Sequence, residues 1–424
     1  MVGAAQIIMV LTLLLMVSGK VPLYLTAVIG ATIAALVAGV PFNDADVTIR
    51  TLLGAGLHPV LLDMLGVLLF IGIMESTGFL KIIIFRIMTL GKRVGGGPGV
   101  AAAGGISAGI IGGMTGFTQP AITSVVTGPA SVKLGVEPNK SAGMHALAGI
   151  LGNYGGFTHP TMVAVVATAG IGFGMINVVG IIVGLSSFVI AFLLMRRSMK
   201  AANAMVADVS DEDLVAEGDR DALTGSFLKA IFPFIVLLAG LIAGFPIVLV
   251  GIVASLLVML LARENPGSGE KVMMASIHRI STPLFATVAF LFMSAVINHI
   301  GLVDLVADRL EPALNAAPIL IMLLVSAVAG FITQSNGASA AIVVPFLAVV
   351  LASGADPFSA AVAAAGGTAI MQYFLTGGPV AALSTVIPVI PGSELKAANR
   401  FQRPAILGTL GVLTIIVLIL MVVR

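Results

Sequence analysis

Cysteine is absent from the 424 residues, and charged side chains are scarce. Without cysteine the chain has no disulfide, no thiolate metal site and no cysteine nucleophile. Only 9% of the residues are charged, whereas a soluble domain carries about 25%, and 58% are hydrophobic. The chain therefore lacks the polar side chains that would cover a water-exposed surface. A formal net charge of only +2, with no basic run interleaved with aromatic residues, predicts no nucleic-acid partner.

Long apolar stretches recur along the whole chain. A stretch of about 18 to 20 apolar residues crosses a hydrocarbon core of roughly 30 Å, so we expect an all-α integral membrane protein. The stretches are continuously apolar and do not alternate as in a β-barrel. The first one precedes the first positive charge, Lys20, so we expect a retained span and not a cleaved signal. The expected membrane elements are 3–19, 21–40, 58–75, 98–134, 141–173, 174–195, 230–242, 243–262, 283–300, 313–353, 358–391 and 403–423.

Two of these elements, 98–134 and 313–353, are too long for one ordinary span. The first contains Gln119-Pro120 and the second contains Ser335-Asn336-Gly337, where we expect the helix to break. Each element is therefore predicted to be a re-entrant helical hairpin, which enters and leaves the membrane on the same side. Stretches with apolar and charged residues at helical spacing, expected to lie in the membrane interface, precede both hairpins: Phe79–Arg93 and Leu302–Glu311.

The distribution of Lys and Arg predicts the orientation, because both residues are retained on the cytoplasmic side. With two re-entrant hairpins the chain crosses the membrane ten times. Placing the hydrophilic linker 196–229 inside leaves only three of the 21 Lys and Arg residues outside: Arg50, Arg309 and Arg424. We therefore expect a multi-pass protein of the inner (cytoplasmic) membrane, with both termini outside and the linker in the cytoplasm.

Matching segments in the two halves indicate an internal duplication. Asn153-Tyr154 through Pro160 matches Gln372-Tyr373 through Pro379 in an amide, a tyrosine and a proline at identical spacing, and the chain has only three tyrosines. Inverted repeats with broken helices are typical of secondary transporters. We expect a first repeat, 1–195, with a hairpin at 98–134 and a broken helix at 141–173, and a second repeat, 230–424, with a hairpin at 313–353 and a broken helix at 358–391.

The four predicted helix breaks are the candidate binding site. An unsatisfied peptide group in hydrocarbon costs several kcal/mol, so a break must be buried in protein or line a wet cavity. Neutral donors and acceptors cluster there, which suits a hydroxylated or carboxylated small molecule and a desolvated sodium ion. The substrate-binding candidates are Thr118, Gln119, Asn153, Tyr154, Thr158, His159, Ser335, Asn336, Gln372, Tyr373 and Thr376. The ion-binding candidates are Thr123, Ser124, Gln334, Ser335, Asn336, Gly337 and Ser339.

The sequence leaves two candidates for the coupling ion, sodium and a proton. Sodium needs a set of oxygen ligands, which the carbonyls and hydroxyls of the hairpin tips offer, and this composition favours Na⁺. A proton needs a titratable carrier, and His159 and His145 lie near the breaks while Asp63 lies farther away. No Ser-His-Asp spacing, HExxH motif or paired carboxylates occur, so we expect neither an enzyme nor a cofactor.

The hairpin tips and breaks also resemble known transporter families. Thr333-Gln334-Ser335-Asn336-Gly337-Ala338-Ser339, closing with Pro345, resembles the Ser-Asn-Thr hairpin-tip motif of the ion transporter superfamily, notably divalent anion/sodium symporters. Gly156-Phe157-Thr158-His159-Pro160-Thr161 is similar to the Gly-Phe-Leu-Pro-Pro-His-Pro region of gluconate permeases, and Leu375–Pro379 to the second break of the large membrane subunit of TRAP transporters. The resemblance implies a homodimer in which a hairpin-bearing transport domain slides past a scaffold. The likeness to gluconate permeases implies proton coupling.

We therefore expect a cation-coupled secondary active transporter of a small organic anion, a carboxylate or a sugar acid such as gluconate. Its partners are the transported anion, membrane lipid and a second copy of the chain. The first alternative is the large subunit of a TRAP-type carboxylate transporter, which needs a small membrane subunit and a binding protein. A channel is the second alternative.

Overall fold

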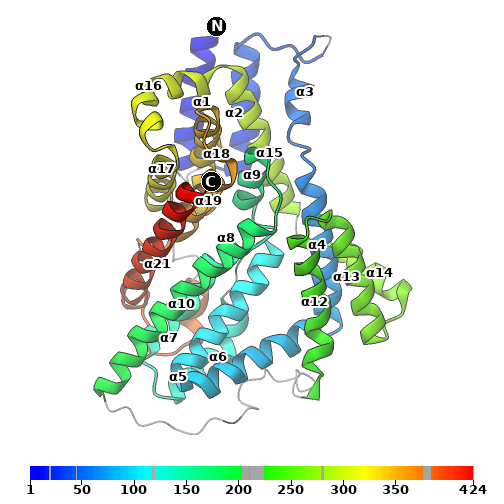
Figure 1. Cartoon of the computed structure of the whole chain (residues 1–424), viewed down its shortest axis with the longest axis vertical. Coiled ribbons are helices and arrows are strands. Elements are labelled where there is room, and N and C mark those ends of the chain that lie inside the picture. Colours follow the sequence, from blue (N-terminus) through cyan, green and yellow to red (C-terminus); the bar gives the residue numbers. More distant parts are fainter. Residues whose placement is uncertain are drawn as a thin grey trace.

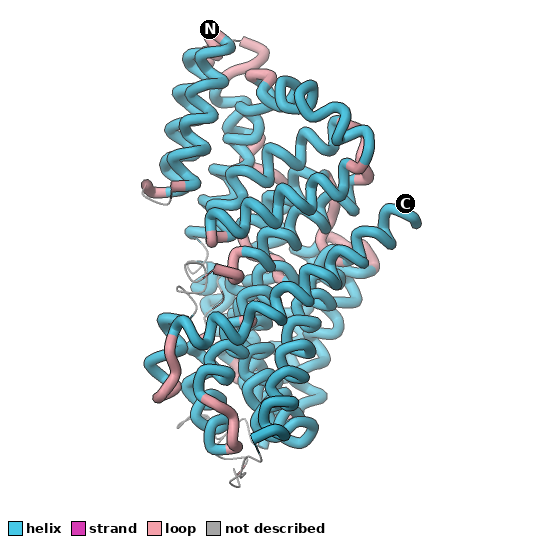
Figure 2. Tube along the Cα trace, turned by 90° about the vertical axis from the view of Figure 1, so that its left-hand side faces the viewer, coloured by secondary structure: helices cyan, strands magenta, loops and turns pink. Residues whose placement is uncertain are grey.

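A computed structural model describes residues 1–18, 21–43, 45–116, 118, 120–202, 210, 224–277, 281–375 and 383–423. The described residues form helices and connecting turns, with no β-strand among them (Figure 2). The helices of the first half are α1 (Val2–Val17), α2 (Leu23–Val37), α3 (Ile49–Gly54), α4 (Val60–Ser76), α5 (Phe79–Thr115), α6 (Ala121–Lys133), α7 (Pro138–Ala146), α8 (Ala148–Gly155), α9 (Pro160–Ala169) and α10 (Met175–Ala202). Those of the second half are α12 (Phe227–Ile242), α13 (Ile247–Ala262), α14 (Pro266–Ile277), α15 (Ser281–His299), α16 (Leu302–Ala316), α17 (Pro318–Thr333), α18 (Asn336–Ala352), α19 (Pro357–Met371), the 3₁₀ turn η3 (Ile387–Val389) and α21 (Leu395–Val423).

Few of the described helices are long enough to span a membrane alone. Only α5, α10 and α21 are long and apolar enough to span a membrane alone, and α15 with α16 forms a pair bent by 74°. Apolar helices such as α2 and α13 have 15 and 16 residues, which is about 22 to 24 Å at 1.5 Å per residue. The expected spans 21–40 and 243–262 begin later because Pro22 and Pro246 stand immediately before the first helical residue.

The interface stretch and the first hairpin arm are joined in one element. α5 consists of two helical segments that meet at a sharp kink at Gly96, so the helix expected over Phe79–Arg93 is a segment separate from the hairpin arm that ends at Thr115. Gly96 has φ 57° and ψ −134°, a conformation that only glycine adopts readily. The helical conformation is interrupted at Gly96, and the second segment continues into the hairpin.

Two helical hairpins interrupt the spanning helices. In hairpin 1, α5 and α6 pack together and are joined by residues 116–120; in hairpin 2, α17 and α18 are joined by only Gln334 and Ser335. Gln334 ends α17 with φ 51°, and the hydroxyl of Ser335 accepts a hydrogen bond from the Ala338 N–H at 3.3 Å, so the tip closes in two residues.

Two further helices are broken near their middles. The first consists of α7, α8 and α9, with residues 156–159 between the last two. The second begins as α19, which ends at Met371; residues 376–382 of the expected broken helix lie outside the described part of the chain.

The helices form one group and two further clusters. The hairpins pack against the broken helices, and α10 and α21 cover them, as seen in the lower and central part of Figure 1. The other helices form two clusters beside this group: α4 packs against α13 and α14, and α2 packs against α1 and α15. Gly66 and Gly251 let α4 and α13 touch through their backbones, because a Cβ at Gly251 would overlap the carbonyl group of Gly66.

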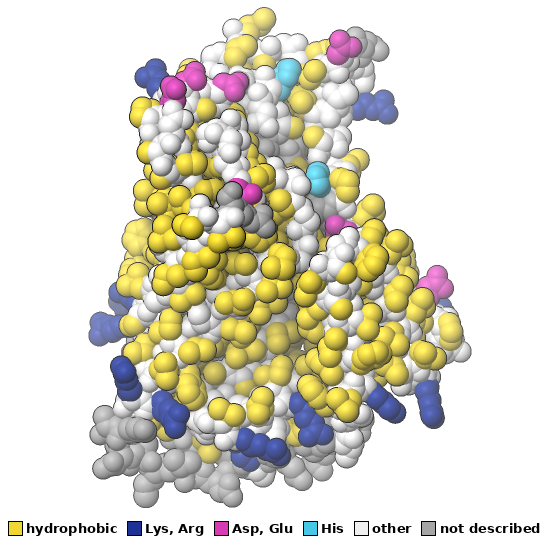
Figure 3. Space-filling model, viewed as in Figure 1, with side chains coloured by type: hydrophobic (Ala, Val, Ile, Leu, Met, Phe, Trp, Pro, Cys, Tyr) yellow, Lys and Arg dark blue, Asp and Glu magenta, His cyan; other side chains and the backbone are white. Residues whose placement is uncertain are grey.

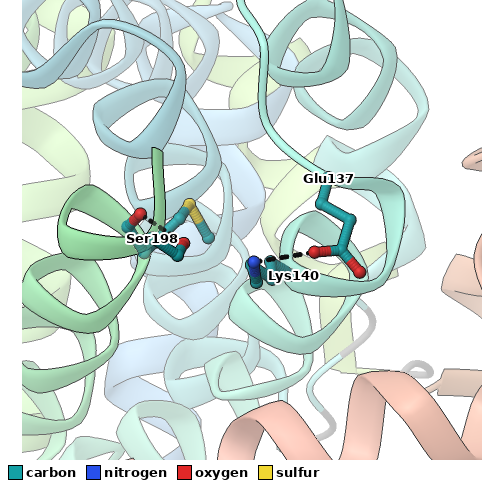
Figure 4. A network of polar contacts seen from close by, with 4 residues as sticks. Glu137, Lys140 and Ser198 are labelled. Carbon is teal, nitrogen blue, oxygen red and sulfur yellow. Dashed lines mark hydrogen bonds and ion pairs between the residues drawn. The ribbon is translucent and has the colours of Figure 1, made fainter. Parts of the chain in front are cut away.

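The surface has an apolar middle and two different ends. Large apolar side chains are exposed along α13 and α21, among them Leu249, Leu256, Ile415 and Ile419. In the face shown in Figure 3, Lys and Arg gather at the lower end, and Asp and Glu at the upper end. Figure 4 shows Lys140 of α7, which pairs with Glu137, the residue before that helix, at 2.7 Å.

Candidate functional site

Asn336, the first residue of α18, joins hairpin 2 to both broken helices. Its backbone N–H donates to the Gln372 side-chain oxygen at 2.9 Å, and its side-chain oxygen accepts from the Thr368 hydroxyl at 2.5 Å. The Thr161 hydroxyl of α9 donates to the Asn336 carbonyl at 2.9 Å. Only 5% of Asn336 is exposed, so these bonds are shielded from water and hold the hairpin tip in one place.

His159, the residue before α9, contacts the same asparagine. Its Nδ1 lies 3.2 Å from the Asn336 side-chain nitrogen and 3.3 Å from the Thr161 backbone nitrogen. Both neighbours are donors, so Nδ1 accepts and the ring is neutral with its proton on Nε2. Nε2 makes no hydrogen bond with any described residue. It is a donor available to a bound solute.

The two matched tyrosines make reciprocal contacts between the broken helices. The Tyr154 hydroxyl donates to the Val362 carbonyl of α19 at 2.9 Å, and the Tyr373 hydroxyl accepts from the Asn153 side chain of α8 at 3.3 Å. Tyr154 is fully buried, and its hydroxyl proton is used within the protein. These contacts join the halves of the chain through positions that the sequence match singled out.

The hydroxyls of hairpin 2 bond mainly to one another. Ser339 donates to the Ser335 carbonyl at 2.7 Å, and the Thr333 hydroxyl lies 2.7 Å from that of Ser339 and 3.0 Å from the same carbonyl. Gly337 faces α2, where a Cβ would meet Leu23 at 3.3 Å. The predicted ion ligands of this tip therefore stabilise the turn and place it against α2.

Hairpin 1 is held by the first helix break. The Gly113 carbonyl accepts from the Phe157 N–H at 2.8 Å and the Thr158 hydroxyl at 3.2 Å. Since Thr158 precedes His159, the break between α8 and α9 contacts both hairpins. Thr123 donates to the Gly104 carbonyl at 2.7 Å.

Two other predicted residues of this hairpin keep unpaired hydroxyls. The hydroxyl oxygens of Thr118 and Ser124 are buried and make no hydrogen bond among the described residues. Buried oxygens without partners are suited to an ion or a bound solute. Two predicted site residues, Gln119 and Thr376, lie outside the described part of the chain.

The structure adds polar residues that the sequence analysis did not select. Thr161 and Thr368 sit within regular helices, where only the tertiary contact with Asn336 reveals them. On α21, Asn399 donates to the Tyr373 carbonyl and Arg403 to the Phe374 carbonyl, both at 3.2 Å. These two satisfy carbonyls that the end of α19 leaves unpaired. The sequence signal that could have indicated them is their spacing of four residues, which places both on one face of α21.

The other candidate proton carriers have structural partners. His145 uses both ring nitrogens, Nδ1 with the Ser141 carbonyl at 2.8 Å and Nε2 with the Thr127 hydroxyl at 2.6 Å. Asp63 receives hydrogen bonds from the backbone N–H groups of Ile247 and Val248 and so caps the start of α13. Of the three, His159 alone combines a place at a break with an unused ring nitrogen.

Two solved transporter structures resemble this one. The YdaH transporter of Alcanivorax borkumensis is 18% identical, with a TM-score of 0.62 over 89% of each chain. The MtrF protein of Neisseria gonorrhoeae, described as one of a class of antimetabolite efflux pumps, is 14% identical, with a TM-score of 0.60 over 92% of this chain and 95% of its own. No family model and no curated protein matches the sequence.

These similarities establish the fold. The chain is an all-helical, multi-pass membrane protein with re-entrant and broken helices, as the sequence predicts, and its structural neighbours are transporters and not enzymes. The Asn336 network therefore lies in a fold that these two solved transporters share.

Proposed function

We propose that the protein is a cation-coupled secondary active transporter of a small organic anion, a carboxylate or a sugar acid. The observation that carries this proposal is the Asn336 network, in which a hairpin tip is held by broken helices from both halves of the chain. Binding sites of secondary transporters lie where such breaks meet. A solute that replaces one of these hydrogen bonds changes how firmly the hairpin is held.

Neutral donors recognise the anion in this proposal. The His159 Nε2–H and the N–H groups of Asn153 and Gln372 belong to the two breaks and are neutral. Neutral donors hold a carboxylate without the high cost of burying an unpaired cation. The unpaired hydroxyls of Thr118 and Ser124 supply oxygens for a further polar ligand, including sodium at the tip of hairpin 1.

An elevator-type movement follows from this grouping of the helices. The hairpins, broken helices, α10 and α21 would move as the transport domain, and α1, α2, α4 and α12–α15 would form the scaffold and the homodimer contact. The two sets of helices meet where hairpin 2 and α9 pack against α1, α2 and α15, with Gly337 facing Leu23, and where α5 packs against α4 and α12. We propose that the chain consists of the inverted repeats 1–195 and 230–424 and the linker 196–229, of which α10 covers the first residues, to Ala202, and α12 the last, from Phe227.

The charge distribution supports the proposed orientation. The Lys- and Arg-rich end in Figure 3 would face the cytoplasm. We propose an inner-membrane protein with both termini outside, as the sequence predicts. The efflux described for MtrF makes export a direction to test alongside import.

A thermal-shift screen of carboxylates and sugar acids, with sodium or choline, tests the proposal. We expect one class of acid to raise the melting temperature of wild type and of Ser353→Ala, at the far end of α18, but not of Asn336→Ala. Stabilisation of all three alike would move the site away from the breaks. If transport by the purified chain needs added subunits, the TRAP alternative is favoured.

A further inference from the structure

We infer that protonation of His159 at Nδ1 releases hairpin 2, which makes a proton the coupling cation. This inference rests on the proposed transport function and deepens it. It starts from two donors that converge on one nitrogen: the Asn336 side chain at 3.2 Å and the Thr161 backbone N–H at 3.3 Å. Both contacts require a lone pair on Nδ1.

A proton taken from water uses that lone pair, and Nδ1 becomes a donor facing two donors. Turning the Asn336 amide over would relieve only one contact, because the Thr161 N–H belongs to the backbone of α9. The protonated ring must therefore leave its position at the start of α9. Asn336 then loses its link to α9 through the ring, and the tip of hairpin 2 is held less firmly.

The surroundings of His159 give the charge no fixed partner. Five helices pack against α9: α8, α18, α19, α15 and α4. The first three contain no Asp, Glu, Lys, Arg or His. The titratable groups on the five helices are therefore Asp63 and Glu75 on α4, His299 on α15, and the hydroxyl of Tyr154 on α8. Among the described residues, no ion pair or hydrogen bond joins any of these groups to His159.

An anionic solute supplies the missing partner. A carboxylate at the Nε2–H stabilises the imidazolium, so a solute anion and a proton each strengthen binding of the other. The empty, neutral site keeps hairpin 2 bonded, and the site with both ligands releases it. This linkage couples the solute to the proton without a buried carboxylate.

Spin labels can follow the hairpin without knowledge of the solute. The chain has no cysteine, so Ile332→Cys near the tip of hairpin 2 and Ile33→Cys on α2, 58% and 45% exposed, are labelled cleanly. Distances between the labels are measured by pulsed electron paramagnetic resonance in lipid nanodiscs from pH 8 to pH 5. For wild type we expect one distance at pH 8 and a second population on acidification, its ratio changing by at most about tenfold per pH unit for one proton.

Two variants identify the group responsible. His159→Asn places a non-titrating acceptor near the position of Nδ1 and should keep the pH 8 distance throughout. Asn336→Ala removes the bond and should show the second population at every pH. A pH response in His159→Asn equal to that of the wild-type background would overturn the inference.

A second measurement serves if a variant does not fold. ¹⁵N-histidine NMR of the wild-type chain should show, for one of its five histidines, an unprotonated Nδ1 at pH 8 that gains a proton as the second population grows. A His159 signal with Nδ1 protonated at pH 8 contradicts the inference. Because no solute is added, these results are independent of the thermal-shift screen, whose failure would count against the transport proposal itself.

Discussion

At the scale of single residues, Asn336 bonds to its neighbours through both its side-chain amide and its backbone. Its nitrogen and oxygen face His159 and Thr368, and its own peptide group contacts Gln372 and Thr161. All of these polar atoms of Asn336 are paired, so a solute that bonds to Asn336 would have to replace a bond that already exists. Binding at Asn336 would change how firmly hairpin 2 is held for that reason.

Replacing Asn336 by alanine tests this arrangement. Losing a buried hydrogen bond costs about 1–3 kcal/mol, which corresponds to about 5- to 150-fold in affinity. We expect solute affinity, measured by calorimetry with an acid found in the screen, to fall within that range. The melting temperature without solute should change little, because the rest of hairpin 2 retains its packing. Unchanged affinity would remove Asn336 from the site.

Tyr154 is expected to behave differently, although the sequence suggests both tyrosines as ligands. Tyr154→Phe removes the hydrogen bond to Val362 and leaves the ring in place, which should lower the unfolding free energy by about 1 kcal/mol. Solute affinity should stay at the wild-type value. A loss of affinity with unchanged stability would instead make Tyr154 a ligand, as first predicted.

At the scale of elements, the hairpins and broken helices could be predicted because they are local features. An apolar run that is longer than one span and contains Ser335-Asn336-Gly337 predicts a helix break at those residues. The residues that bond to the breaks are distant in sequence and have no local signal. Thr161 and Thr368 lie in helices, and only the tertiary fold brings them to Asn336. The same holds for Asp63, whose role as the cap of α13 depends on the contact between α4 and α13.

That contact between α4 and α13 gives a stability prediction. In Gly251→Ala the added methyl group would overlap the backbone of Gly66 and push the helices apart, so we expect a loss of about 1–3 kcal/mol. Gly411→Ala on α21 is the matched control, because its Cβ would meet nothing within 4 Å. Thermal unfolding in detergent should separate the two variants; equal melting temperatures would contradict the close approach.

At the scale of the whole molecule, the opposite orientation of the two repeats is the prediction with the widest consequences. Lys133→Cys at the mouth of hairpin 1 should react with a membrane-impermeant maleimide only from the cytoplasmic side. Ser353→Cys at the mouth of hairpin 2 should react only from outside, and it spares Asp356, whose carboxylate caps α19. Labelling of both sites from the same side would rule out inverted repeats.

The central claim is that this chain alone carries a solute through the site around Asn336, and counterflow in proteoliposomes tests it most directly. Vesicles with purified protein are loaded with the acid found in the screen and diluted into a trace of the labelled acid. We predict transient accumulation by wild type and Ser353→Ala, and none by Asn336→Ala. Equal accumulation by all three, or none by wild type, would contradict the account.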